Sequence, residues 1–358
     1  MSIEDFLDHI EHRAVYRDGQ LDGADFTGAA FAGAAVLRTS FRGTCFTGAD
    51  LRDCTFIGCD FDGARFDEAA LERTGFVGGS AVDSSWRGSR LTAVGLLDCK
   101  LTRANFAGAN FAQTTIAKAE LDQAIFGSTK FFESCLLNCS FDSIDIAGAE
   151  LRNSAVMGAD LRRSSIDGVV CDTVLLAQCD LTDRDLRSLR LARVNLTEAK
   201  LDRANLSGVD LSGAMLARAS LIKANLSRIT APSAVLASAD LRGADLSRAA
   251  LPNAIFQGAR LAGANCDVAT LEMAVFAEAD ASAASFRGAL LHYAQFHHAA
   301  VEHADFSGAR FLRTDFHCAR AEGAVLAVHS GDRLETDLAR AIGELYDPKR
   351  VRPPQERR

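Results

Sequence analysis

Four residues near the end of the chain carry side chains that could bind a transition metal. His297 and His298 are followed, 20 residues later, by His317 and Cys318. Imidazole nitrogen and thiolate sulfur are ligands that Zn²⁺ and related metals prefer. A metal site here would require a fold that brings positions 20 residues apart into contact.

A five-residue repeat organises most of the chain. From Leu21 to Leu326 an apolar residue, usually Leu or Phe, recurs at every fifth position without a slip and forms the centre of each repeat. All but two of the 22 Phe occupy this position. A small residue, usually Ala, stands two positions before it. Neither the period of a helix nor that of a strand produces this spacing, so it indicates a repeat fold.

The repeat resembles that of the pentapeptide-repeat family, whose pattern is roughly A(D/N)LXX. Matching runs are Ala104-Asn105-Phe106, Ala204-Asn205-Leu206 and Ala239-Asp240-Leu241. The resemblance covers residues 21–328. It implies an all-β fold, a right-handed parallel quadrilateral β-helix with four pentapeptides in each coil and about 15 coils. Glycine follows many centres by two residues, where a corner would require a positive φ.

Residues 20 apart would then stack on adjacent coils, so His297 would lie next to His317 and His298 next to Cys318. Our first interpretation is that these four are polar surface residues near the end of a rod. The alternative is that they form a metal site. No cofactor is predicted.

The ten cysteines mostly fit the frame as small inward residues. Four of them share a column on alternate coils: Cys59, Cys99, Cys139 and Cys179. The distance between alternate coils exceeds the reach of a disulfide. We therefore expect reduced thiols and a cytoplasmic protein.

Helices are expected at both ends of the rod. Residues 1–20 would contain a capping helix over 2–13 and a lead-in, and residues 329–358 a helix over 332–346 followed by a basic, disordered tail. The second helix carries an apolar stripe that would cover the last coil or contact a second copy: Leu334, Leu338, Ile342 and Leu345. No apolar run approaches the roughly 20 residues of a membrane span, and no secretory signal is evident.

Two stretches, 74–99 and 169–194, lack the small inward residues of the repeat. Arg184 is the strongest misfit, because a charged side chain occupies a position where a methyl group normally packs. The sequence predicts a bulge or a looped-out corner there.

One face of the expected rod carries no charge over 26 outward positions, from Ala35 to Ala277. An apolar strip of this length exceeds what monomers usually expose, so we expect a partner to cover it. The alternative is that small residues are simply tolerated on a flat β face. The larger members of this face are Leu37, Ile57, Val77, Leu97, Leu137, Met157, Leu175, Met215, Val235, Ile255 and Val275.

No constellation of catalytic residues stands out, and the regular glycine spacing is not that of a phosphate-binding loop. We predict a non-catalytic scaffold that presents its apolar face to a protein partner or a second copy, without direct binding of nucleic acid or a small-molecule substrate. The family resemblance implies two alternatives: a DNA-mimicking modulator of DNA gyrase or topoisomerase, or an accessory protein of a bacterial secretion apparatus. The formal net charge of −8 is small for a DNA mimic.

Overall fold

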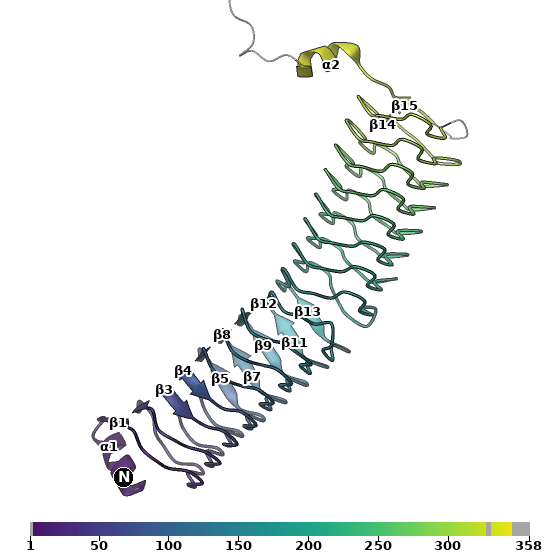
Figure 1. The fold of residues 1–358 in the computed structure, drawn as a ribbon. Helices are drawn as coiled ribbons and strands as arrows, with labels where there is room; N and C mark the ends of the chain where they lie inside the picture. The colour runs from purple at the N-terminus through teal and green to yellow at the C-terminus, as the bar shows by residue number, and fades with distance from the viewer. Residues whose placement is uncertain (1–2, 327–330, 346–358) are drawn as a thin grey trace, which may run out of the picture.

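The computed structural model describes residues 3–326 and 331–345, and these form a long rod of stacked coils (Figure 1). The strand pairings and bridges are parallel, and almost all join positions 20 residues apart, from Val15 with Ala35 to Asp305 with Val325. The predicted all-β class and the four-pentapeptide coil are therefore confirmed. The fold is a parallel β-solenoid of about 16 turns with two short helices.

Two sheets run along neighbouring walls of the first half of the rod. The larger has the order β1-β2-β3-β4-β6-β8-β10-β12. Its strands are β1 (Val15–Arg17), β2 (Ala35–Leu37), β3 (Thr55–Asp60), β4 (Gly75–Ser80), β6 (Gly95–Leu97), β8 (Thr115–Ala117), β10 (Cys135–Leu137) and β12 (Ala155–Met157). The second comprises β5 (Arg90–Thr92), β7 (Asn110–Ala112), β9 (Lys130–Phe132), β11 (Glu150–Arg152) and β13 (Val170–Asp172). Beyond β13, isolated bridges continue the ladders.

The interior is filled by the repeat centres and by the small residues two positions before them. Where Thr or Cys replaces Ala, its side chain usually donates a hydrogen bond to a carbonyl oxygen 23 residues earlier. Thr74 Oγ1 lies 2.7 Å from the Leu51 oxygen, and Cys54 Sγ lies 2.9 Å from the Phe31 oxygen. These inward polar groups are satisfied, so they do not disturb the coil. The stretch 74–99 accordingly keeps the regular pairing from β3 through β4 to β6, although Gly79, at an inward position, has a φ of 95°.

The corner residue two positions after a centre usually adopts a left-handed backbone. Gly23 has a φ of 67° and Asp53 has a φ of 60°. Glycine reaches this conformation without steric cost, and Asp or Asn at a lower cost than most residues. The glycine preference of the repeat follows from this geometry.

The coil at Arg184 departs from the regular pattern without inserting a residue. Val170 still pairs with Arg190, and Asp185 with Asn205. The Arg184 guanidinium instead turns back along the rod and donates to the Ser164 oxygen at 2.8 Å and to the Arg162 oxygen at 3.2 Å. The predicted disturbance is thus present in the backbone as well, since the corner residues Arg163 and Ser188 lack a positive φ, but the 20-residue register is kept. The guanidinium turns back because it needs these acceptors.

The core beneath this coil is incompletely filled. A void of about 30 Å³ lies there, lined only by apolar side chains such as Ile166, Leu186 and Leu189. In Figure 1 the rod changes direction just after β13, next to this coil.

The helices at the two ends are shorter than the sequence predicts: α1 is Ile3–Glu11 and α2 is Leu338–Leu345. The prediction that Leu334 belongs to the second helix is wrong. It lies in β15 (Arg333–Leu334), which pairs with β14 (Thr314–Asp315), and its carbonyl accepts a hydrogen bond from the Phe316 N–H at 2.9 Å. The last coil leaves backbone groups at its edge that need partners, and residues 333–334 supply them.

Some predictions fall outside the described part of the chain. The side chain of Leu345 and the basic tail after Pro348 are among them. Within the described residues, neither helix has the length and apolar character required to cross a membrane.

Candidate functional site

The predicted uncharged face is a single continuous surface, here called the uncharged wall (positions 35–277 of the columns before and after its centres). Its first half is the large sheet from β2 to β12. Its second half is a ladder of bridges that passes from Ala155 through Leu175 and on to Val275. The 20-residue register thus aligns every predicted residue of the face on one side of the rod.

The aliphatic side chains of the uncharged wall remain in contact with solvent. Those exposed are Ile57, Val77, Leu97 and Met215. Those half-buried are Leu37, Leu137, Met157, Leu175, Val235, Ile255 and Val275. Within the described chain no terminal helix covers this wall, since α1 and α2 lie at the ends of the rod (Figure 1).

Charged side chains on the rest of the rod are largely paired with each other across coils. Arg38 donates to both carboxylate oxygens of Asp18 at 2.8 Å, and Arg73 does the same to Asp53 at 2.6 and 2.8 Å. The hydrogen bonds from Arg38 hold the pKa of Asp18 below its usual range. Equivalent pairs join Asp83 to Arg103 and Asp183 to Arg203.

The columns of the uncharged wall become polar at their C-terminal end. Beyond Val275 and Ala277 they continue as Gln295, His297, Asp315 and His317. An open groove of about 660 Å³ lies there. It is lined by Met273, Tyr293, Gln295, His297, Arg313, Asp315, Leu334 and Arg340.

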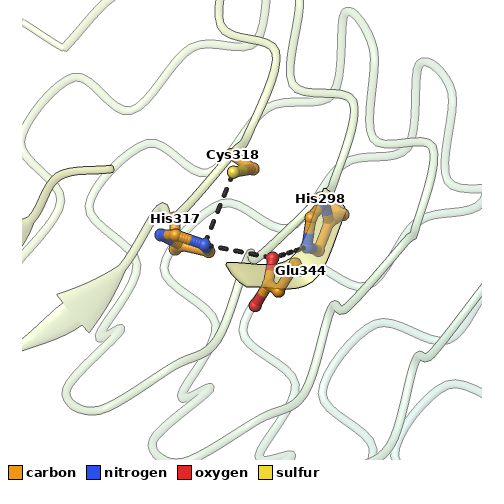
Figure 2. Close-up of side chains that lie close together, drawn as sticks. All are labelled: His298, His317, Cys318 and Glu344. Carbon is orange, nitrogen blue, oxygen red and sulfur yellow. Dashed lines mark hydrogen bonds and ion pairs between the residues drawn. The ribbon is translucent and has the colours of Figure 1, made fainter. Parts of the chain in front are cut away.

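Next to the groove, four potential metal ligands converge from three segments (Figure 2). They are His298, His317, Cys318 and Glu344, and their ligand atoms all lie within 4.8 Å of one another. Glu344 Oε2 is 2.9 Å from His298 Nε2 and 3.3 Å from His317 Nε2. Cys318 Sγ is 3.4 Å from the same nitrogen of His317. We call these four residues the His–Cys–Glu cluster.

Two of the ligands in this cluster, His317 and Glu344, are oriented by a second contact. The backbone N–H of Asp337, directly before α2, donates to His317 Nδ1 at 3.1 Å. Arg340 Nε donates to the other oxygen of Glu344, Oε1, at 2.8 Å. Burial alone would raise the pKa of Glu344, but the hydrogen bonds from Arg340, His298 and His317 outweigh it and lower the pKa. The carboxylate is therefore held in its charged form.

The structure changes the membership of the predicted histidine group. His298, His317 and Cys318 meet, but His297 does not join them and lines the groove instead. Its Nδ1 is buried without a hydrogen-bond partner, and burial lowers the pKa of His297. Glu344 was missed by the sequence argument. It belongs to the polar side of the predicted helix, but no pattern in the chain indicates which coil that side contacts.

Most of the remaining cysteines lie in the core and are poor nucleophiles. Burial raises the pKa of Cys54, Cys59 and Cys179 to about 11, and that of Cys99 and Cys171 to about 12. All ten cysteines are free. The inward cysteines therefore serve packing and hydrogen bonding.

Comparison with known protein families agrees with this architecture. A family model described as "Pentapeptide repeat region" matches residues 24–106. A second, "Pentapeptide repeats (8 copies)", matches residues 89–127, 190–228, 233–265, 269–308 and 294–326. The chain belongs to the pentapeptide-repeat family. Neither match includes residues 128–189, the part of this pentapeptide-repeat protein that contains Arg184.

Solved structures of other pentapeptide-repeat proteins share the fold at low identity. QnrB1, a plasmid-mediated fluoroquinolone resistance protein, is 22% identical, with a TM-score of 0.37 over 51% of this chain and 92% of its own. HetL from the cyanobacterium Nostoc sp. strain PCC 7120, involved in heterocyst differentiation regulation, is 25% identical, with a TM-score of 0.22 over 70% and 87%. Rfr23 from the cyanobacterium Cyanothece 51142 is 20% identical, with a TM-score of 0.15 over 45% and 90%. No curated protein matches the sequence.

Proposed function

We propose that this pentapeptide-repeat protein is a non-catalytic scaffold whose uncharged wall binds a protein partner. The observation that supports the proposal is the continuity of the wall. Its 26 positions follow one another along the rod without an Asp, Glu, Lys, Arg or His, although Asp, Glu, Lys and Arg make up 24% of the chain. Solvation alone would favour charges on such a surface, as on the other walls.

The size of the wall suits a protein interface. Thirteen coils spaced at roughly 4.8 Å extend for about 60 Å, and a three-residue strand, whose first and third residues face outward, spans roughly 10 Å. The resulting area of about 600 Å² exceeds most apolar patches of monomers and approaches the roughly 800 Å² that each partner buries in a standard interface. A flat, preformed sheet also loses little conformational entropy on binding.

The surface charge argues against the alternative of DNA mimicry. A mimic of duplex DNA needs unpaired negative charges along its length, because the duplex carries one charge per roughly 1.7 Å. Many carboxylates here are instead neutralised by arginines, as in the Asp53–Arg73 pair. A supercoiling assay with DNA gyrase checks this directly, and we expect no inhibition at micromolar protein.

A pair of charge insertions tests the proposed surface. Val235→Glu combined with Ile255→Glu places two carboxylates in adjacent coils of the uncharged wall. We expect the double variant to lose complexes that the unmodified protein forms, either with a captured partner or with a second copy, as measured by light scattering and crosslinked pull-down. The physical reason is that burying an unpaired carboxylate at an interface costs several kcal/mol.

The matched control is Thr230→Glu with Ala250→Glu, which adds the same charges to the same coils on a neighbouring wall. Both double variants should keep the thermal stability of the unmodified protein, because the substituted positions face outward. If the wall variant retained every complex, or if both variants lost them equally, the uncharged wall would not be the binding surface.

A further inference from the structure

The His–Cys–Glu cluster has the composition of a transition-metal site. Two imidazole nitrogens, one sulfur and one carboxylate oxygen form a mixed donor set that suits Zn²⁺. In a tetrahedral zinc site, ligand bonds of roughly 2.0–2.3 Å place neighbouring donors about 3.3–3.7 Å apart. The observed separations of 2.9, 3.3 and 3.4 Å lie close to this range.

We propose that His298, His317, Cys318 and Glu344 bind one divalent transition metal ion, with Zn²⁺ as the preferred ion, and that this ion ties α2 to the last coils. The proposal does not depend on the function of the uncharged wall. The donors come from one corner, from the adjacent coil and from α2, so a bound ion would crosslink elements that no disulfide joins.

The surroundings orient the donors as a metal site requires. His317 is almost fully buried, with its side chain 2% exposed, whereas His298 is 43% exposed and leaves a path for the ion. Arg340 binds Glu344 Oε1 and leaves Oε2 directed toward the two imidazoles. Hydrogen bonds of this kind, behind the ligands, fix ligand orientation in known metal sites.

Protons must leave the cluster when the ion binds. The Asp337 N–H can only donate, so His317 Nδ1 accepts, and the neutral ring carries its proton on Nε2. A metal ion needs the Nε2 lone pair. The proton of the ring must therefore shift to Nδ1, and Nδ1 can then no longer accept from the Asp337 N–H. The Cys318 thiol must also release its proton to solvent. The Asp337 amide must then turn away from the ring, and because the His317 side chain is only 2% exposed, its Nδ1–H needs a new acceptor there.

The first measurement is the metal content of untagged protein, followed by calorimetric titration of the metal-free protein with ZnCl₂. We expect one equivalent of Zn²⁺ to bind. Cys318→Ser and His298→Ala should each weaken binding at least tenfold. His303→Ala is the matched control, because His303 is an exposed histidine of the same end outside the cluster, and it should leave the affinity unchanged.

Two further readouts separate binding at this site from adventitious binding. Co²⁺ should give the absorption of a thiolate-bound ion in the unmodified protein and lose it in Cys318→Ser. Hydrogen exchange should become faster at the Asp337 amide and slower across α2 when Zn²⁺ is added. The proposal is overturned if Zn²⁺ fails to bind at micromolar concentration, or if Cys318→Ser and His303→Ala bind it equally well.

Discussion

The two terminal helices share an amphipathic pattern but meet the rod in different ways. In α1, Phe6 is 1% exposed, and its ring packs against those of Tyr16, Phe26, Phe31 and Phe41 at centroid distances of 4.9–5.7 Å. In α2, Leu338 and Ile342 are 73% and 71% exposed. That helix is held instead by polar contacts of Glu344 and Arg340.

The difference teaches that an apolar stripe on a terminal helix does not by itself identify a cap. The first coil has an open apolar end, and α1 inserts an aromatic ring into it. At the other end β15 pairs with β14 along the edge of the last coils, and α2 stands off the rod (Figure 1). Of the two predicted roles for the second helix, covering the last coil or contacting a second copy, the exposure of Leu338 and Ile342 argues against the first, and the second stays a prediction.

The largest expected effect is that of Phe6→Ala. Removing this buried ring leaves a cavity among four aromatic residues and should lower the free energy of unfolding of the N-terminal coils by about 3–5 kcal/mol. Because each coil contacts only its neighbours, the loss should appear as local fraying. Hydrogen exchange across β1 and β2 and chemical denaturation measure it.

Ile342→Ala is the matched control at the other end. Its side chain is already exposed, so the change in stability should stay within about 0.5 kcal/mol. A comparable loss in both variants would remove the distinction between a helix packed by apolar contacts and a helix held by polar contacts.

An intermediate effect is expected from salt. Ion pairs at the surface are screened at about 1 M salt, whereas apolar packing is not weakened. Hydrogen exchange of the α2 amides should therefore become faster as salt rises, and that of α1 should not. Equal protection of α2 at low and high salt would indicate that apolar contacts hold it after all.

The smallest effect concerns the ion pair beside the first coil. Asp18→Asn removes the carboxylate that Arg38 binds, and exposed pairs of this kind contribute little. Because the pKa of Asp18 is lowered in the folded protein, its contribution is present above the usual value of 3.8 and is lost as the pH falls through the lowered value. The melting temperatures of Asp18→Asn and the unmodified protein should differ slightly at pH 7 and converge in acid.

Much of the fold could be predicted because the repeat acts at every position. A strict period of five places Phe56 and Leu221 inside, and the coil of four repeats then aligns Val235 with Ile255 on one wall. Arg184 could be identified as a misfit for the same reason. Its conformation could not, because it depends on which carbonyl oxygens of the previous coil are free to accept, here those of Arg162 and Ser164.

The candidate metal cluster could likewise be predicted in part from the sequence. His317 and Cys318 were placed near His298 by the coil length alone. His297 was placed with them as well, but its side chain lines the groove. It occupies the same position of the repeat as His317, and of the two only His317 contacts Glu344 and the Asp337 N–H. Glu344 joins only because residues 333–334 pair with the last coil and α2 then begins after Asp337.

By itself the amino-acid sequence determined the period, the interior and the uncharged wall, because these depend on which side chains are apolar at regular intervals. Only the tertiary structure decided how the ends are covered and which polar side chains meet. Those outcomes depend on unpaired backbone edges and on the docking direction of single helices, which no periodic pattern encodes.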